Sequence, residues 1–353
     1  MKAAQLFAPG DLRVVEIETP SPGKGQVLVQ VEACGICGSD IPRIKETGTY
    51  HFPTVPGHEF MGKVAAVGGD VPQDLVGRRA AVVPLIGCGT CAMCRAGLPY
   101  HCASYDFLGS RSNGGFAEYV VAPASNLVFV GDAISSVAGA MLEPISVALH
   151  SVRRPGVDAG DTVVVFGAGA IGLFVAQWAG TCGAGRVIQV DIREESLEVA
   201  RRCGIDTVIN ALHENVVEKV SQLTHVRGAD LAVEAAGAAE STADAFRCVR
   251  RRGRVSLIGR IDGDWTMPED VLTGFMRKEQ TLFGNWGFDA CPFPASDWDV
   301  AVDALESGRI VVDPLISHTF VLEDVHEAIQ LMAEGREYFC KVVLVFPSSG
   351  RVV

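Results

Sequence analysis

The chain has two parts that differ in their pattern of apolar and polar positions. In the first part, up to about residue 150, residues 26–32 alternate apolar and polar side chains, and residues 80–83 do so more weakly. A period of two predicts half-buried β-strands. Proline and glycine runs at 20–25 and 56–59 predict loops. We therefore expect a twisted, barrel-like β domain with long loops.

After residues 153–156, strand and helix patterns alternate. Short apolar runs predict six strands, at 162–166, 186–190, 207–209, 231–234, 255–258 and 281–284. The segments between them predict helices, starting near 171 and spanning 194–203, 216–223 and 241–249. This alternation is typical of an α/β protein with a doubly wound parallel sheet. A helix at 299–306 and a strand at 341–345 follow. We expect residues 1–152 and 286–353 to form one domain and residues 153–285 the other.

Composition limits the classes of partner. With 353 residues, of which 48% are hydrophobic, the chain is long enough for two packed domains. It has 30 basic and 42 acidic residues, a net charge of −12, which argues against nucleic acid or an anionic membrane as the partner. Six glycines interrupt the uncharged stretch 162–185, so a strand, a turn and a helix explain it better than a membrane span. We expect a cytoplasmic protein whose eleven cysteines are reduced.

A glycine-rich turn follows the first strand of the second domain. Gly167, Gly169 and Gly172, with Ala170 and Ile171 between the last two, form a GxGxxG pattern that opens a helix. These glycines permit a tight turn, close approach of a pyrophosphate, and close helix–strand packing. Small residues also serve helix packing alone, but the strand–turn–helix context favours a dinucleotide site.

Asp191 ends the second strand of that domain, nineteen residues after Gly172. A carboxylate there accepts hydrogen bonds from ribose hydroxyls and repels a 2′-phosphate, which favours NAD over NADP. Asp191 could instead cap the next helix, and Arg193 could accommodate the phosphate of NADP.

Four cysteines lie close together in the first domain. Cys88, Cys91, Cys94 and Cys102 can surround one tetrahedral zinc ion, and a site closed by four thiolates is structural. An iron–sulfur cluster is the alternative. A second set of metal-ligand types, Cys37, His58, Glu59 and Glu143, is spread along the chain. Spacing does not show that these converge, and Cys34 could replace Cys37.

Several motifs together resemble a known family. CGICGSD at 34–40, GHE at 57–59, the four-cysteine lobe and GAGAIG occur in the order of the zinc-dependent medium-chain dehydrogenase/reductase superfamily. The resemblance covers essentially the whole chain. It implies a GroES-like catalytic zinc-binding domain and a Rossmann dinucleotide-binding domain. It also implies a catalytic zinc held by Cys37, His58 and Glu143, with Glu59 close to the metal. A glutamate at the position of Glu143, where other branches have cysteine, points to the polyol dehydrogenases.

Within this branch, segments 37–44, 105–119 and 277–286 resemble the galactitol-1-phosphate 5-dehydrogenase group, and sorbitol (iditol) dehydrogenases are the next neighbours. The resemblance implies oxidation of a secondary alcohol of a sugar alcohol, most plainly galactitol 1-phosphate, with hydride transfer to NAD. Zinc would act as a Lewis acid on the alcohol oxygen. A homo-oligomer, dimer or tetramer, is expected. The alternatives are an unphosphorylated polyol, an alcohol or threonine-type substrate, or a dinucleotide-binding protein without catalysis.

Three further residues are candidates for roles near the zinc. The superfamily often has a proton-relay histidine where this chain has Pro42, so we expect Ser39 to take part in the relay, with Glu59 and water. A turn-stabilising hydroxyl is the other role open to Ser39. Arg43 and Arg111 could bind a substrate phosphate through paired donors. Alternatively, each arginine pairs with a carboxylate such as Asp40 or Asp106.

Overall fold

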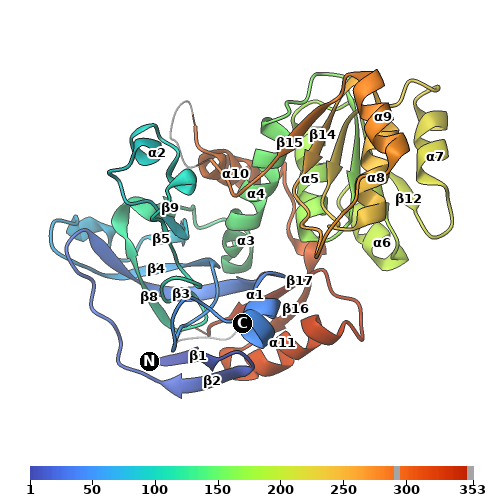
Figure 1. Ribbon diagram of the computed structural model, residues 1–353. Helices are drawn as coiled ribbons and strands as arrows, with labels where there is room; N and C mark the ends of the chain where they lie inside the picture. Colours follow the sequence, from blue (N-terminus) through green and yellow to red (C-terminus); the bar gives the residue numbers. More distant parts are fainter. Residues whose placement is uncertain (290–294, 348–353) are drawn as a thin grey trace. The chain divides into compact units, whose positions relative to one another are not determined.

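The computed structural model describes residues 1–289 and 295–347 (Figure 1). It contains two compact units. As far as these stretches are described, unit 1 consists of Met1–Glu143, Asp289–Glu306 and Ile316–Val353, and unit 2 of Pro144–Phe288 and Ser307–Leu315. The chain returns to unit 1 after completing the sheet of unit 2.

Unit 1 is built on a seven-stranded sheet in which β16, β17, β3, β4, β5 and β9 follow one another and β8 also pairs with β3. All pairs are antiparallel except β16–β17. The strands of unit 1 are β1 (Lys2–Ala8), β2 (Asp11–Glu16), β3 (Gln26–Ile36), β4 (Glu59–Val67), β5 (Arg79–Val82), β6 (Leu85–Ile86), β7 (Asp106–Phe107), β8 (Tyr119–Pro123), β9 (Leu127–Phe129), β16 (Ile316–Phe320) and β17 (Lys341–Val345). Its helices are α1 (Asp40–Pro42), α2 (Ala92–Arg95), α3 (Ser136–Ala140), α10 (Asp297–Glu306) and α11 (Val325–Glu334).

β3 is the central strand of unit 1. It pairs with β4, β8 and β17, and Val27, Val29 and Val31 belong to the buried core of the unit. The alternation expected for residues 26–32 is only partly visible in burial, because Leu28 is buried as well. A strand covered on both faces does not need polar alternate positions.

Unit 2 contains a six-stranded parallel sheet in the order β12-β11-β10-β13-β14-β15, which confirms the doubly wound fold (Figure 1). The strands are β10 (Thr162–Phe166), β11 (Arg186–Asp191), β12 (Thr207–Asn210), β13 (Ala229–Glu234), β14 (Val249–Leu257) and β15 (Thr281–Gly284). The helices are α4 (Leu142–Arg153), whose first two residues belong to unit 1, α5 (Ala170–Thr181), α6 (Glu194–Arg202), α7 (Val216–Leu223), α8 (Ala239–Cys248) and α9 (Glu269–Lys278). The chain winds outward from β10 to β12 and then returns to β13, so a switch point lies between β10 and β13, where such folds bind ligands.

The unit bounds differ from the expected domain bounds. Most of α4 belongs to unit 2, because Trp178 and Ser256 donate hydrogen bonds to backbone carbonyls of this helix, at 3.0 and 2.9 Å. Residues 307–315 also belong to unit 2, where Gln177 bonds both backbone groups of Val311. Helix α9 was not expected, and Val249, expected to end a helix, begins β14.

Among the described residues, no helix combines the length and the hydropathy that a transmembrane span requires.

Candidate functional site

Three of the expected metal ligands converge in unit 1. Cys37 follows β3 directly, and His58 precedes β4 while Glu59 begins it. Because β3 and β4 are antiparallel with Gly35 opposite Glu59, the end of one strand meets the beginning of the other. One ligand atom from each of the three side chains lies within 4.8 Å of the other two. Thiol, imidazole and carboxylate form a donor set that suits zinc.

The two cysteines of this segment differ in burial and in their neighbours. Cys34 is fully buried within β3 and belongs to the hydrophobic core of unit 1. Burial raises the pKa of its thiol well above the usual range, and the nearby carboxylates of Asp40 and Glu59 raise it further. Cys34 is therefore a neutral core thiol, whereas Cys37 lies with His58 and Glu59.

Two further charged residues lie in this cluster: Asp40, expected only as a possible arginine partner, and Lys341, which was not expected here. Asp40 is fully buried, accepts a hydrogen bond from the backbone N–H of Cys37 at 3.0 Å, and lies 3.4 Å from Nδ1 of His58. Lys341, at the start of β17, forms an ion pair with Glu59 and donates a hydrogen bond to the carbonyl of Ile36 at 3.1 Å.

These charges oppose the effect of burial on ionisation. Burial lowers the pKa of His58, but the carboxylate of Asp40 and the thiol of Cys37 outweigh it and raise that pKa well above its ordinary value. Lys341 likewise has a raised pKa, because Glu59 and Cys37 outweigh its burial. The cluster therefore holds alternating positive and negative groups in a buried site.

Glu143 lies in the first turn of α4 and is also buried. Its carboxylate oxygens are not part of the group of atoms that lie within 4.8 Å of one another. Burial raises the pKa of Glu143 to about 7, with a further rise from Glu59 and opposing effects of His58 and Lys341. Glu143 therefore lies within electrostatic range of His58 and Glu59.

Gly35 makes room for this cluster. A Cβ at residue 35 would overlap an oxygen of Glu59 and would lie 2.8 Å from Cε of Met141, just ahead of α4. A side chain at this position would displace the Glu59 carboxylate, so we infer that glycine is required here.

Ser39 and Arg43 lie beside Cys37. The hydroxyl of Ser39 donates a hydrogen bond to Sγ of Cys37 at 3.3 Å and accepts one from Nη1 of Arg43, also at 3.3 Å. The same nitrogen of Arg43 lies 3.5 Å from Asp40. Arg43 therefore pairs with Asp40, one of the two roles considered for it. Its side chain is 30% exposed.

Arg111 has a different environment. Its guanidinium carbon lies 4.0 Å from the ring centre of Tyr50 and 4.4 Å from that of Tyr105. No carboxylate pairs with it among residues 1–289 and 295–347, and its Nε is buried without a hydrogen-bond partner. The loop that carries it packs on the segment leading to His58, since Gly114 and Gly115 donate to the carbonyls of Val55 and Gly57, both at 2.8 Å. Phe107, at the end of β7 just before this loop, lies beside the His58 ring, with ring centres 5.5 Å apart.

The four-cysteine lobe forms a second group of ligands. Sγ atoms of Cys88, Cys91, Cys94 and Cys102 all lie within 4.8 Å of one another. The Cys88–Cys94 distance of 3.9 Å is close to the edge of about 3.8 Å in a tetrahedron with Zn–S bonds of about 2.3 Å. The hydroxyl and backbone N–H of Thr90, with the N–H of Cys91, lower the pKa of Cys88 to about 5. The thiolate form that zinc binds is thus favoured at this position.

The glycine-rich loop of unit 2 connects β10 to α5. A Cβ on Gly172 would overlap the carbonyl of Gly167, whereas around Gly169 the corresponding space is open. Ala170 and Ile171 form the first turn of α5, whose N-terminus presents free backbone N–H groups. This geometry fits a pyrophosphate at the loop.

Asp191, at the end of β11, faces this loop. One carboxylate oxygen accepts a hydrogen bond from the N–H of Ala168 at 2.6 Å, and the other accepts from the N–H of Arg193 at 2.8 Å. Arg193 caps α6 without a side-chain cap bond. The carboxylate therefore links two neighbouring loops at the edge where dinucleotides bind in such sheets.

Two family descriptions match this chain. The alcohol dehydrogenase GroES-like domain matches residues 23–132, and the zinc-binding dehydrogenase matches residues 170–307. Among curated proteins, galactitol 1-phosphate 5-dehydrogenase of Escherichia coli K12 is 33% identical over 95% of this chain and 97% of its own. L-idonate 5-dehydrogenase of Vitis vinifera is 34% identical, covering 94% of this chain and 92% of its own.

Solved structures agree in fold. Galactitol-1-phosphate dehydrogenase from Escherichia coli superposes with a TM-score of 0.91 at 33% identity, covering 98% of this chain and all of that one. A dehydrogenase from E. coli CFT073 in complex with NADH has a TM-score of 0.89 at 32% identity, covering 98% of this chain and 99% of its own. A zinc-binding dehydrogenase from Sinorhizobium meliloti bound to NADP is 29% identical and also has a TM-score of 0.89, covering 98% of this chain and 99% of its own. The zinc and the nicotinamide dinucleotide expected from the sequence agree with the cofactors named for this family and these relatives. The chain belongs to the zinc-binding medium-chain alcohol and polyol dehydrogenase family.

Proposed function

We propose that this protein oxidises a secondary alcohol of a sugar alcohol phosphate, galactitol 1-phosphate being the first candidate, to the corresponding ketose phosphate with NAD as hydride acceptor. The convergence of Cys37, His58 and Glu59 carries this proposal, because it supplies a zinc site with a mixed donor set. Two zinc ions per chain are proposed, a catalytic one at Cys37, His58 and Glu143 with Glu59 close by, and a structural one in the Cys88–Cys102 lobe.

Zinc, when bound, would supply Lewis-acid polarisation of the alcohol oxygen. The residues of the chain then have separate roles. Cys37, His58 and Glu143 hold the metal, and the ion pair with Lys341 holds Glu59 in a fixed orientation. Ser39 now donates to Cys37, so its part in proton transfer requires that its hydroxyl turns to the substrate and passes the proton on through water.

NAD is proposed over NADP. The carboxylate of Asp191 is held by two backbone N–H groups beside the glycine-rich loop, where its charge would repel a 2′-phosphate. Gly167, Gly169 and Gly172, with Ala170 and Ile171, would hold the pyrophosphate. Arg193 is the residue that would favour NADP instead.

The phosphate preference rests mainly on Arg111. Its guanidinium contacts two tyrosine rings, has no carboxylate partner among the described residues, and lies in a loop packed against the segment that leads to His58. Arg43 contributes less, because it is already bonded to Ser39 and lies near Asp40.

An unphosphorylated polyol or sugar acid is the second candidate substrate. The pairing of Arg43 with Asp40 favours it, since a neutralised arginine attracts phosphate weakly. Relatives named L-idonate 5-dehydrogenase and sorbitol dehydrogenase, the latter from Bacillus subtilis at 29% identity, cover nearly the whole chain.

The substrate test compares kcat/KM for galactitol 1-phosphate, galactitol, sorbitol and L-idonate, with NADH formation as the readout. A charge-assisted hydrogen bond contributes roughly 1.5–3 kcal/mol, so the phosphorylated substrate should lead by at least about tenfold. Arg111→Gln should remove that lead and leave activity on free polyols unchanged. Arg78→Gln is the matched control, because Arg78 also stacks on an aromatic ring, that of Phe129. If the wild type has equal kcat/KM for phosphorylated and free polyols, the second candidate substrate replaces the first.

We also propose a homo-oligomer, dimer or tetramer. Strand β15 is an edge of the unit 2 sheet, and it and the following loop carry the exposed apolar side chains of Leu282 and Trp286. Exposed edge strands with apolar side chains favour pairing with another chain.

A further inference from the structure

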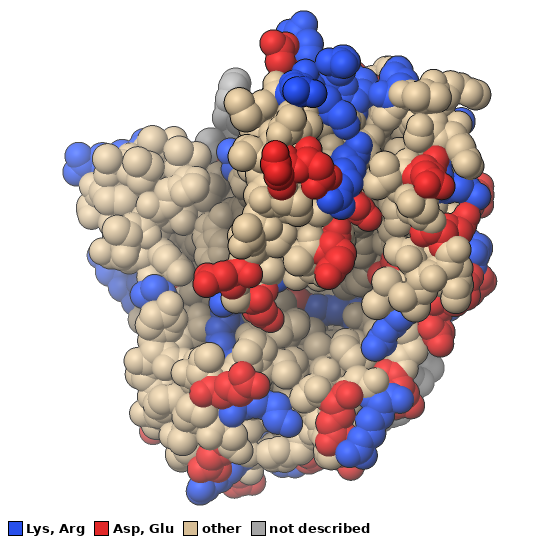
Figure 2. Space-filling view, turned by 45° about the vertical axis from the view of Figure 1, so that its right-hand side comes forward, with Lys and Arg blue, Asp and Glu red and all other residues tan. Residues whose placement is uncertain are grey.

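Basic side chains are concentrated in one short segment of this acidic protein. Residues 247–254 contain five arginines, although the chain as a whole carries a net charge of −12. The segment includes the end of α8 and the start of β14 and therefore lies at the amino-terminal edge of the parallel sheet. Figure 2 shows Lys and Arg side chains gathered near the top of the view. The carboxyl ends of the strands, where the glycine-rich loop lies, are at the opposite edge of the sheet.

A cavity of about 240 Å³ opens in this basic segment. It lies between α7, the turn after it, the α8–β14 junction and the end of α9, and no Asp or Glu lines it. The basic residues that line it are Arg227, Arg247, Arg250, Arg251 and Lys278.

Three of these five cations are already neutralised. Asp230 binds both Arg227, at 3.1 Å, and Arg250, at 2.5 Å. Arg247 pairs with Asp244 and Asp270, at 3.0 and 2.8 Å. Asp230 is thus shared by two of the arginines, and Asp244 and Asp270 both pair with Arg247. Arg251 and Lys278 are the remaining cations of the cavity.

Arg251 and Lys278 have neutral hydrogen-bond partners only, as far as the described chain extends. Arg251 donates to the carbonyl of Arg277 at 3.2 Å, and Lys278 donates to the carbonyls of Arg247 and Val249, both at 2.9 Å. Burial lowers the pKa of Lys278, and the charge of Arg251 lowers it further. Two cations that repel each other at the rim of a cavity gain stability from a shared anion.

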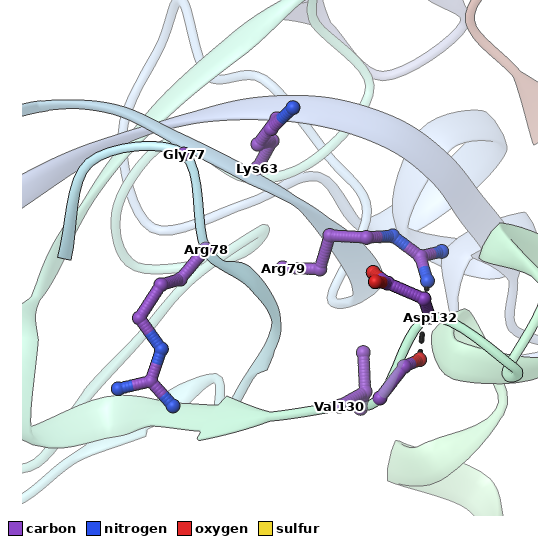
Figure 3. A pocket seen from close by; sticks show the side chains of 7 residues that line it. Lys63, Gly77, Arg78, Arg79, Val130 and Asp132 are labelled. Carbon is purple, nitrogen blue, oxygen red and sulfur yellow. Dashed lines mark hydrogen bonds between the residues drawn. The ribbon is translucent and has the colours of Figure 1, made fainter.

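A second basic cavity, of about 260 Å³, lacks this arrangement. It lies near Lys63, Arg78 and Arg79, and Asp132 also lines it (Figure 3). Figure 3 shows Lys63 and Arg78 pointing away from one another, and Arg79 donates to the carbonyls of Gly131 and Ile134. Its cations do not converge on one point.

We propose that the cavity at the α8–β14 junction binds a small phosphate-bearing anion through the guanidinium of Arg251 and the ammonium of Lys278, separately from the active site. A guanidinium offers paired donors that match phosphate oxygens, and an ammonium adds a compact charge. A cavity of about 240 Å³ fits a small molecule better than an extended polyanion. This proposal does not depend on the substrate proposed above.

Equilibrium dialysis of the NADH-saturated holoenzyme tests the site, with inorganic phosphate, a hexose monophosphate and pyrophosphate as probes. Saturating NADH blocks the dinucleotide loop, and the Arg43→Gln/Arg111→Gln variant removes the candidate substrate contacts without affecting the cavity. At least one probe should bind saturably to both proteins, and the tightest probe identifies the class of ligand.

Arg251→Gln and Lys278→Gln should each weaken that binding by about tenfold or more, as expected for loss of a charge-assisted contact. Arg252→Gln is the matched control, because Arg252 is adjacent and exposed but does not line the cavity, and it should change binding by less than about twofold. Arg251 is exposed, so its variant should retain the wild-type melting temperature. Three results would overturn the proposal: no saturable binding up to about 10 mM, equal losses in the Arg251 and Arg252 variants, or binding that disappears in the Arg43→Gln/Arg111→Gln variant.

Discussion

Lys341 and Glu59 form an ion pair in which both side chains are almost fully buried. Removing one partner of such a pair leaves an uncompensated charge in the interior and costs about 3–5 kcal/mol. We expect Lys341→Met to lower the free energy of unfolding, measured in urea, by about this amount. The double variant Lys341→Met/Glu59→Gln should recover a large part of the loss, because no isolated carboxylate remains. Purely additive losses would mean that the two side chains do not stabilise each other.

Asp191 combines an electrostatic and a structural role, and two substitutions separate them. Asp191→Ser removes both the charge and the long acceptor, whereas Asp191→Asn retains an oxygen for the N–H of Ala168. Both variants should raise the ratio of NADP to NAD activity, measured as kcat/KM, because the negative charge is gone. Only the serine variant should also lose affinity for both dinucleotides. A wild-type preference for NADP would show that Arg193 outweighs Asp191.

At the scale of elements, the two groups of metal ligands differ in how they are assembled. The cysteine lobe comprises β6, α2 and the turn before Cys102, so its ligands come from one short segment. The other group needs the end of β3, the start of β4 and the first turn of α4.

This difference leads to a prediction about metal content. Wild-type protein should contain two zinc ions per chain by elemental analysis, and Cys91→Ser should contain one and be less stable, because metal binding contributes to folding of the lobe. His58→Ala should also contain one zinc ion, remain folded and bind NADH, but turn over poorly. Cys182→Ser, which changes an exposed cysteine outside both groups, is the control and should retain two. One zinc ion in active wild type would contradict two separate sites.

The same difference explains which features the sequence could predict. The cysteine lobe and the glycine-rich loop are local, and β10 is buried along its whole length, so an unbroken apolar run identifies it. Helix α9 was missed because the exposed apolar residues Leu272 and Met276 follow directly after Val271 and Phe275, which pack on the core, so the buried positions do not stand out in the sequence. Lys341 could not be assigned to the site, since its partner Ile36 lies 305 residues away. The sequence indicated only that a lysine begins the apolar segment that forms β17.

At the scale of the whole molecule, the exposed edge of unit 2 predicts self-association. Strand β15 pairs with β14 on one side only, and Leu282 is 42% exposed. We expect Leu282→Lys to lower the mass measured by light scattering after size exclusion, because a charge on an edge strand opposes pairing. Leu212→Lys is the matched control, since Leu212 is 68% exposed in the same unit away from that edge, and it should leave the mass unchanged. A wild-type monomer would rule out the proposed oligomer.

The long separation in sequence between Lys341 and Glu59 also has a consequence for biosynthesis. At about 5–20 residues per second, a ribosome adds Lys341 roughly 15–60 s after Glu59. Until then the Glu59 carboxylate lacks the cation that compensates it, and β17 is absent from its place beside β3. The cysteine lobe has no such delay, because Cys88 and Cys102 emerge together. We therefore expect nascent chains to acquire metal in the lobe first, and the Glu59 carboxylate beside the catalytic ligands to gain its ion-pair partner only after Lys341 has been added.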